Sequence, residues 1–119
     1  MGSEMCIRDR NYKNKVLKAN DIATMSTGKR LGHPVRSIKN PYTKEYFKLE
    51  YSNISDEELE AYGRGSLYRA AVEGDEKTGC FLAGQIAGMV NKEQTAKEII
   101  EEIFTQAEDV LKGATKWVK

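Results

Sequence analysis

The sequence contains only one histidine and two cysteines in 119 residues, so it offers few of the side chains that bind metals or act as nucleophiles. A structural zinc site needs about four Cys or His ligands at defined spacings, and Cys6, Cys80 and His33 do not form such a set. No serine or cysteine has an evident base partner, so the sequence gives no support for a nucleophile triad. We therefore expect no metal site and no disulfide framework, which fits a reducing, cytoplasmic setting.

The chain also lacks an excess of charge and any long apolar run. Lys and Arg number 19 against 18 Asp and Glu, which gives a formal net charge of +1. A strongly basic face, typical of binding to nucleic acid or anionic membranes, is therefore not expected. No apolar run approaches the roughly 20 residues of a membrane-spanning helix, and no signal-peptide pattern is present. We expect neither nucleic acid nor a membrane as a partner.

Strand-forming sequence is scarce, and the regular alternation of strands and helices of an ordinary α/β domain is missing. Only 21–27 alternates apolar and small polar residues, and it is predicted to be a strand. Helices are expected over 11–20, 35–40, 42–51, 54–62 and 66–72. The expected fold class is mainly α, with five or six helices and at most one or two short strands.

Two local signals set helix boundaries in these predictions. Ser55 and Glu58 have the spacing of a capping box, which predicts a helix start. Pro34 is assigned to the first turn of the short helix over 35–40, which we expect to end before Pro41.

The most regular pattern is near the C-terminus, where apolar residues recur every three or four positions. These residues are Ala96, Ile99, Ile100, Ile103, Phe104, Ala107, Val110, Leu111, Ala114 and Trp117. The spacing predicts a long amphipathic helix, with Asn91 as N-cap and Gln94 completing a capping box. Its apolar stripe needs a surface to lie on. We expect most of that surface to be absent from this chain, which would leave an aggregation-prone patch.

Before this helix lies a segment, 79–90, in which small residues alternate with large apolar ones. Its small residues allow another backbone or a flat ligand to approach closely. They include Ala83, Gly84, Ala87 and Gly88. Gln85 lies between them and either contacts the edge of a flat polar ligand or serves backbone groups at a helix start. Cys80 is expected to be a buried small hydrophobe.

The histidine and the basic residues within 30–39 each have two possible interpretations. Histidine is the residue type that titrates near neutral pH when unperturbed, so His33 is either a general acid or base or, as we favour, a loop residue that orients backbone. Arg30, Arg36 and Lys39 either hold a phosphate or pair with carboxylates, and the near-neutral composition favours pairing.

The first ten residues fit none of these patterns. The run 5–10 resembles translated adapter sequence, and we expect residues 1–10 to be a non-native leader. On this view residues 11–119 are the natural part, from which the preceding natural segment has been cut away.

From Asn11 onward, an ordered set of motifs resembles the C-terminal part of the flavin-dependent enoyl-[acyl-carrier-protein] reductases, the FMN class within the nitronate monooxygenase superfamily. The matching segments are 12–19, 32–40, 63–71, 73–75, 83–88 and 92–100. Each motif is weak by itself, whereas the ordered set is fairly specific.

The resemblance implies a (β/α)8 barrel that holds FMN at the C-terminal mouth of its strands. Such enzymes pass hydride from NADH or NADPH through the flavin to a trans-2-enoyl thioester on acyl carrier protein, in bacterial fatty acid synthesis. A barrel needs about 250 residues, so this chain would be a truncated, helical C-terminal extension. It would be inactive alone and would not bind FMN or NAD(P)H by itself. The resemblance leaves open a homodimer.

The resemblance places no catalytic residue in this chain. Leu82, Ala83, Gly84 and Gln85 match the segment that approaches the substrate and flavin, with Leu82 as an apolar wall and Gln85 as a polar contact. His33, Arg36 and Asn40 match a motif expected to be structural, which holds the extension to the barrel. The family's active-site histidine would lie upstream and is not His33.

Two alternatives remain open at this stage. A nitronate monooxygenase of the same superfamily would use FMN and oxygen without a nicotinamide. A stand-alone helical module would bind a partner helix or protein through the stripe over 96–117, and a compact core that buries this stripe would favour it.

Overall fold

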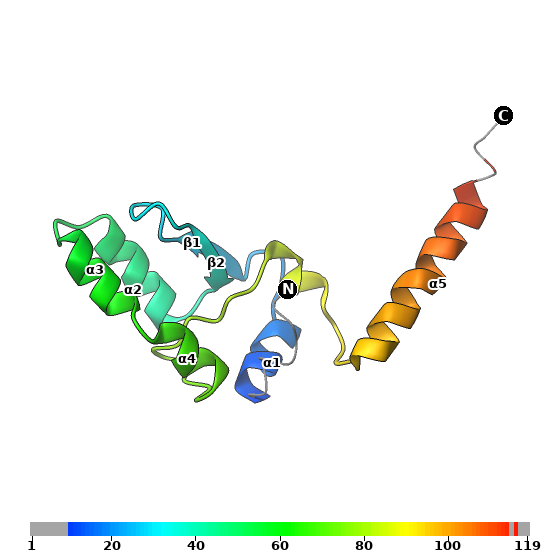
Figure 1. Cartoon of the computed structure of the whole chain (residues 1–119), viewed down its shortest axis with the longest axis horizontal. Coiled ribbons are helices and arrows are strands. Elements are labelled where there is room, and N and C mark those ends of the chain that lie inside the picture. Colours follow the sequence, from blue (N-terminus) through cyan, green and yellow to red (C-terminus); the bar gives the residue numbers. More distant parts are fainter. Residues whose placement is uncertain (1–9, 115, 117–119) are drawn as a thin grey trace.

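The computed structural model describes residues 10–114 and 116, and these residues form a mainly helical chain with one small sheet (Figure 1). In chain order the elements are α1 (Arg10–Leu17), β1 (Thr24–Thr27), β2 (Val35–Ile38), α2 (Pro41–Glu50), α3 (Asp56–Gly63), α4 (Ser66–Ala71), the 3-10 helix η1 (Gln85–Met89) and α5 (Ala96–Ala114). The two strands pair antiparallel, with Thr24 opposite Ile38 and Thr27 opposite Val35. The predicted mainly α fold with few strands is confirmed.

The chain is elongated. Figure 1 shows α2, α3 and the sheet at one end, α1 and η1 in the middle, and α5 projecting at the other end. The Cα radius of gyration is 18.0 Å, whereas a compact domain of this length would have about 13–14 Å. The packed part of the molecule therefore ends before α5 begins.

The segment 35–40 is a strand and a helix cap, so the helix predicted there is wrong. Val35 and Ile38 are β-branched residues, which pack well on a pleated surface, and they pair with β1 across the hairpin. Pro41, which was expected to end a helix, instead occupies the first turn of α2 behind the N-cap Asn40. This position suits proline because the first-turn N–H has no intrahelical partner.

Capping boxes close the N-termini of α2 and α3. In α3, Glu58 N donates to Ser55 Oγ at 3.2 Å and Ser55 N donates to Glu58 Oε2 at 2.9 Å, as predicted from the sequence. In α2, Thr43 N donates to Asn40 Oδ1 and Asn40 N donates to Thr43 Oγ1, both at 2.9 Å. Each box satisfies two backbone donors that the helix itself leaves without partners.

The core consists of two hydrophobic clusters joined by an extended segment. The first contains Tyr12, Ile38, Ala70 and Phe81, and the second contains Tyr42, Tyr46, Leu59 and Cys80. The segment lies beside β2, because Ile38 N donates to Phe81 O at 2.8 Å and Leu82 bridges to Ser37. Gly79 allows this path, since a Cβ at that position would lie 2.8 Å from Ala70 Cα.

The long helix α5 begins at Ala96, so the predicted start at Asn91 is wrong. Glu98 N donates to Thr95 Oγ1 at 3.2 Å and Thr95 N donates to Glu98 Oε2 at 2.7 Å, which forms the capping box. Asn91 and Gln94 have the same spacing as Thr95 and Glu98, so spacing alone does not choose between them. A glutamate at N3 is favoured by the helix dipole over a neutral glutamine.

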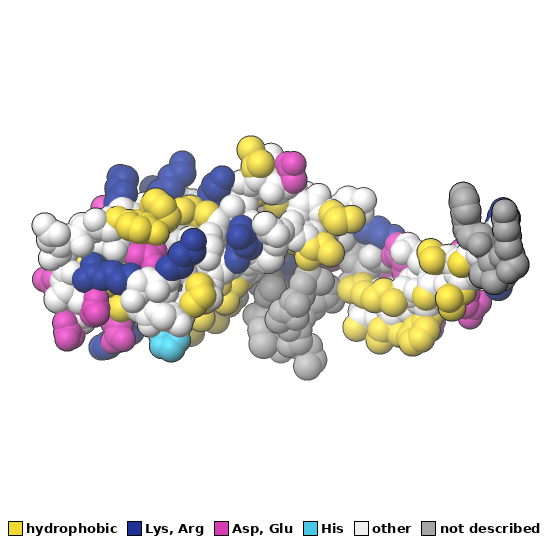
Figure 2. Space-filling view, turned by 90° about the horizontal axis from the view of Figure 1, so that it is seen from above, with side chains coloured by type: hydrophobic (Ala, Val, Ile, Leu, Met, Phe, Trp, Pro, Cys, Tyr) yellow, Lys and Arg dark blue, Asp and Glu magenta, His cyan; other side chains and the backbone are white. Residues whose placement is uncertain are grey.

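The apolar stripe of α5 is present and uncovered. No described residue of α5 is buried, and yellow apolar side chains line one edge of the helix in Figure 2. Trp117, the last predicted member of the stripe, and residues 1–9 of the predicted leader lie outside the described residues, whereas Arg10 begins α1. None of the described helices is long and apolar enough to span a bilayer.

Candidate functional site

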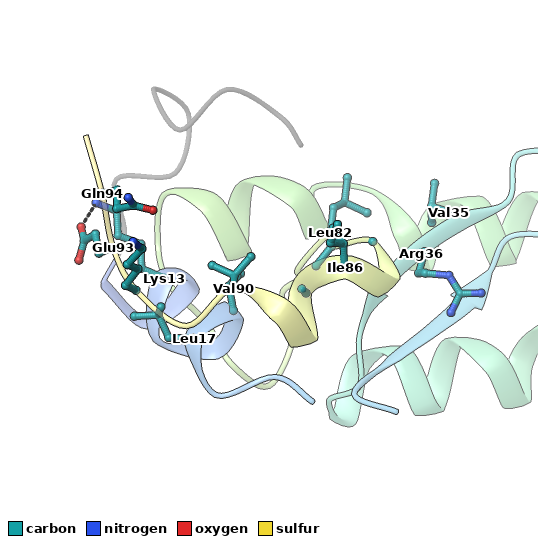
Figure 3. A pocket seen from close by; sticks show the side chains of 14 residues that line it. Lys13, Leu17, Val35, Arg36, Leu82, Ile86, Val90, Glu93 and Gln94 are labelled. Carbon is teal, nitrogen blue, oxygen red and sulfur yellow. Dashed lines mark hydrogen bonds and ion pairs between the residues drawn. The ribbon is translucent and has the colours of Figure 1, made fainter. Parts of the chain in front are cut away.

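A groove of about 440 Å³ opens between α1, β2 and η1 (Figure 3). Its lining is mostly apolar and comes from three separate parts of the chain. The residues are Lys13, Val16, Leu17, Val35, Arg36, Leu82, Ala83, Gly84, Ile86, Ala87, Val90, Lys92, Glu93 and Gln94. Three of the four predicted flavin- or substrate-facing residues, Leu82, Ala83 and Gly84, therefore share one groove.

Backbone hydrogen bonds place these three residues. Ala83 N donates to Arg36 O at 3.2 Å, which continues the pairing of the segment with β2. The Tyr12 hydroxyl of α1 donates to Leu82 O at 2.6 Å. The groove wall is thus attached to a strand on one side and to a helix on the other. Burial raises the pKa of Tyr12 to about 12, so its hydroxyl remains a donor at alkaline pH values at which an exposed tyrosine would ionise.

The small residues of the segment 79–90 have two different roles. A Cβ at Gly88 would lie 2.7 Å from Asn20 C and 2.8 Å from Asp21 N, so the predicted close approach of a second backbone is confirmed there. At Gly84, by contrast, a Cβ would meet no atom of the described part of the chain within 4 Å, apart from its sequence neighbours. Gly84 therefore presents open backbone at the edge of the groove, where a flat group has room to approach.

The fourth predicted residue, Gln85, does not line the groove. It occupies the first position of η1 and its side chain is exposed. The side-chain amide of Gln85 makes no hydrogen bond with the residues that the structure describes, and η1 has no side-chain cap. Its amide is therefore available to a group outside the described chain.

Charged residues gather at one end of the groove. Glu93 accepts from Lys13 Nζ and Arg10 Nη1, each at 2.6 Å. Hydrogen bonds from Lys13 and Arg10 hold the pKa of Glu93 below its usual range. Glu102 of α5 pairs with Lys92 at 2.9 Å and accepts from Gln94, and these contacts lower the pKa of Glu102. Two carboxylates thus tie the segment before α5 to its neighbours.

The three residues of the predicted structural motif do not meet in one cluster. Asn40 caps α2 and its Nδ2 donates to Gly79 O at 2.7 Å. Arg36 Nη1 donates to Thr24 Oγ1 at 3.3 Å, and its side chain points away from Leu82 and Ile86 in Figure 3. Each residue therefore serves a different local contact, and their attachment to a barrel stays a prediction.

His33 belongs to the tight loop between the two strands. Its N–H donates to Gly28 O at 3.1 Å, and its carbonyl lies so close that a Cβ at Gly28 would be 2.6 Å away. Gly28 has φ 78°, a conformation that favours glycine. The side chain of His33 is exposed. The favoured interpretation of His33 as a loop residue agrees with these backbone contacts.

Glu50 is the residue that the sequence analysis missed. Glu50 is 4% exposed, and its carboxylate accepts from Gly28 N at 3.2 Å and Arg30 N at 2.8 Å. Arg30 in turn pairs with Asp56 through Nε at 2.8 Å, so the predicted carboxylate pairing is confirmed for Arg30. An acidic residue at the end of a helix carries no local signal that it will bind a loop 20 residues earlier.

Cys80 is buried, as predicted, and burial raises the pKa of its thiol. Such a thiol is poorly nucleophilic because little thiolate forms near neutral pH. Within the described part of the chain, no group of three or more His, Cys, Asp or Glu side chains is placed to hold a metal ion. The groove therefore offers a ligand apolar side chains and a stretch of open backbone.

The sequence matches no protein-family model, and comparison with curated proteins also gives no match. Among solved structures it is similar to FabK from Thermotoga maritima, with 34% identity, a TM-score of 0.86, and coverage of 92% of this chain and 35% of that one. The M276A mutant of that protein matches with 30% identity and a TM-score of 0.75, covering 92% and 32% of the two chains. The chain spans about a third of the length of these structures. The likeness in both sequence and structure confirms the predicted resemblance to the flavin-dependent enoyl-[acyl-carrier-protein] reductase class.

Proposed function

We propose that this chain forms part of an FMN-dependent enoyl-[acyl-carrier-protein] reductase, which reduces trans-2-enoyl thioesters on acyl carrier protein with NADH or NADPH. The observation that carries the proposal is the similarity to FabK at 34% identity and a TM-score of 0.86. Because the chain spans 35% of that structure, the activity belongs to a longer polypeptide with a (β/α)8 barrel, of which this chain is a helical extension.

The groove residues have the properties of a wall beside a flat ligand. Leu82 supplies apolar surface and Gly84 supplies open backbone. The flavin, when bound, supplies hydride transfer between the nicotinamide and the double bond of the thioester. The contribution of Leu82, Ala83 and Gly84 would be to position the flat ring or acyl group and to exclude water from it.

The basic residues that line the groove, Lys13 and Arg36 among them, do not form a site for the phosphate of FMN. Lys13 is already paired with Glu93, and Arg36 is turned toward Thr24. Phosphate sites in proteins need several converging donors, such as a glycine-rich loop before a helix. We therefore expect the phosphate to be held by the longer protein, and this chain alone to bind FMN weakly or not at all.

Gln85 is proposed as a polar contact to the substrate or flavin. Its exposed amide stands at the start of η1, next to the open backbone of Gly84. An amide offers both a donor and an acceptor, which suits the edge of a flavin or a thioester carbonyl.

The experiment replaces the matching third of Thermotoga maritima FabK by this chain. We expect a yellow protein that oxidises NADH or NADPH with crotonyl thioester and has little activity with an alkyl nitronate and oxygen. Leu82→Asp should weaken flavin or substrate binding, whereas the exposed control Ile22→Asp should not. A colourless, folded chimera would remove the proposal, and preference for the nitronate would favour a nitronate monooxygenase.

A further inference from the structure

A second cavity, of about 250 Å³, lies beside the groove. Its lining comes from the hairpin of β1 and β2, from α2, from the corner between α3 and α4, and from the segment 79–90. Tyr42 and Tyr46 of α2 form part of this lining, and we call the cavity the tyrosine pocket. Val35 and Leu82 line both the tyrosine pocket and the groove. The two cavities are therefore neighbours that share one wall.

The tyrosine pocket offers little that would bind an ion. Among the described residues that line it there is no Asp, Glu, Lys or Arg. His33 also belongs to the lining, and its side chain is exposed. Burial raises the pKa of Tyr42 to about 12 and also raises the pKa of the Cys80 thiol, which disfavours the ionised form of both groups. The pocket therefore suits an uncharged, apolar ligand.

The shared wall joins the apolar surfaces of the two cavities. Val35 and Leu82 are 41 and 37% exposed, and Figure 3 shows their side chains pointing the same way. Side chains alternate in direction along an extended backbone, so Leu82 lies on the same side of its segment as the buried Cys80 of the tyrosine pocket. A long ligand that passes Leu82 therefore stays on apolar surface as it enters the pocket.

The size of the tyrosine pocket suits one end of a longer molecule. Sites that hold a whole drug-sized ligand occupy about 300–1,000 Å³, which is more than this pocket provides. A cavity of ~150 Å³ binds benzene, so 250 Å³ has room for on the order of ten carbon atoms. A linear acyl chain has the required properties, because it is narrow and apolar and its other end can lie in the groove.

The corner between α3 and α4 bounds the tyrosine pocket and contains a residue with which its size can be changed. A Cβ at Gly63 would lie 3.5 Å from Tyr46 Cε2 and 3.8 Å from the Tyr42 hydroxyl, so the packing there is already close. Leu67 of α4 lines the pocket and is 52% exposed. A larger or smaller side chain at Leu67 would therefore alter the pocket without overpacking the core.

We propose that the tyrosine pocket holds the far end of the acyl chain of the enoyl thioester, and that it thereby sets the chain length that the enzyme prefers. The proposal rests on the proposed function for the class of substrate and adds a second subsite beyond the groove. In this arrangement Val35 and Leu82 lie along the path of the acyl chain, and Leu67 limits its length.

Binding of saturated thioesters tests the pocket directly. The probes are the dodecanoyl and butyryl thioesters of N-acetylcysteamine, which contain no double bond to reduce. Added to this chain, the dodecanoyl thioester should shift the NMR signals of the Tyr42 and Tyr46 rings, whereas the butyryl thioester should not reach them. Affinity should rise about fourfold for each methylene that enters the pocket.

Variants at the corner separate a ligand in the pocket from a general effect on the fold. Leu67→Trp should weaken dodecanoyl binding by about tenfold or more, because the indole takes the space of several methylenes. Tyr68→Trp is the matched control. Tyr68 is the neighbouring residue on α4, is 59% exposed and does not line the pocket, so its replacement should leave the affinity unchanged.

Turnover by the chimera with FabK tests the effect on specificity. The measured quantity is the ratio of kcat/KM for a trans-2-dodecenoyl thioester to that for a crotonyl thioester. Leu67→Trp should lower this ratio by about tenfold or more, and Leu67→Ala should raise it by giving the chain more room. Tyr68→Trp should leave the ratio unchanged.

Three results would overturn the proposal. The first is that the dodecanoyl thioester shifts the two tyrosine signals no more than the butyryl thioester does. The second is an equal effect of Leu67→Trp and Tyr68→Trp on dodecanoyl binding. The third is an active chimera whose ratio responds to neither Leu67 variant, because a side chain from the rest of the polypeptide would then fill the pocket.

Failure of the proposed function is seen separately. A folded chimera that binds no flavin would remove the proposed function, whereas selective dodecanoyl binding at Tyr42 and Tyr46 would retain the pocket. The thioester titrations are made on both this chain and the chimera, and if one of the two does not fold, the titration of the other decides.

Discussion

Cys80 and Phe81 are neighbours in the sequence, yet their side chains belong to different hydrophobic clusters. Side chains alternate in direction along an extended backbone, so one residue pair joins the two halves of the core. Phe81 is fully buried, and its ring lies 4.9 Å from that of Tyr12, measured between centroids. The pair therefore ties the segment that lines the groove to α1 and to α2.

Replacement of Phe81 by alanine should destabilise the chain severely. Removal of a buried phenylalanine costs about 3–5 kcal/mol, which is comparable with the whole stability of a small domain. We expect Phe81→Ala to abolish cooperative unfolding in urea, followed by circular dichroism. Ile22→Ala, at a side chain that is 69% exposed, should change the stability by less than about 0.5 kcal/mol. Equal effects of the two variants would contradict the two-cluster core.

Glu50→Gln should loosen the loop between β1 and β2. The carboxylate of Glu50 accepts two backbone N–H groups, from Gly28 and Arg30, and an amide replaces one of its oxygens by a donor. A buried donor or acceptor without its partner costs about 1–3 kcal/mol. The measurement is chemical denaturation, with the NMR shifts of the Gly28 and Arg30 amides. Glu45→Gln, at an exposed carboxylate that pairs with Lys48, should have little effect.

Thr95→Ala should shorten α5 from its N-terminus, because Thr95 Oγ1 accepts from Glu98 N. Loss of an N-cap costs about 0.5–2 kcal/mol. Secondary chemical shifts of residues 96–99 should move toward coil values. Asn91→Ala is the decisive control, since the sequence pattern alone assigned the cap to Asn91. If Asn91→Ala has a larger effect than Thr95→Ala, the N-cap of α5 is Asn91, and the start seen in the structure is contradicted.

The attachment of the 91–95 segment to α1 should weaken at acidic pH. Lys13 and Arg10 lower the pKa of Glu93, so the contribution of this contact to stability is present above the ordinary glutamate pKa of about 4.3. It is lost as the pH falls through the lower pKa of the folded state. An NMR titration of Glu93 should show a midpoint below about 4.3 that Lys13→Met raises. An unchanged midpoint in Lys13→Met would exclude this ion pair in solution.

The fold should also lose stability at alkaline pH through two buried phenols. Burial raises the pKa of both Tyr12 and Tyr42 to about 12. A raised pKa in the folded state means that this contribution is complete below the ordinary tyrosine pKa of about 10 and is lost as the pH rises through the folded-state value. Phenolate absorbance should show late-ionising tyrosines, with unfolding at the same pH. Tyr51→Phe, at an exposed ring, should leave the late phase intact.

The elements that the sequence predicted correctly are those decided by nearby residues. The capping box of Ser55 and Glu58 depends on residues three apart, and the stripe of α5 depends on helical periodicity. The mainly α fold follows from these local patterns. The uncovered stripe agrees with the expectation that most of its packing surface is absent from this chain.

The parts that were missed depend on contacts between distant residues. Val35 and Ile38 form a strand only because Thr27 and Thr24 lie opposite them. Glu50 binds a loop that precedes it by 20 residues. At the groove, small residues suggested a close approach, and the structure shows one at Gly88, whereas the approach of a ligand to Gly84 stays a prediction. The sequence did not indicate that Gln85 would lie outside the groove that Leu82 lines.

The empty space beside Gly84 gives this position a diagnostic value among related sequences. Gly79 and Gly88 are each pressed against another stretch of backbone, so folding alone is enough to retain glycine there. Within residues 10–114 no neighbouring atom prevents alanine or serine at Gly84. If homologues nevertheless keep glycine at this site, the selective pressure comes from a molecule that the polypeptide must admit, and homologues that no longer admit it should be the first to accept a larger residue.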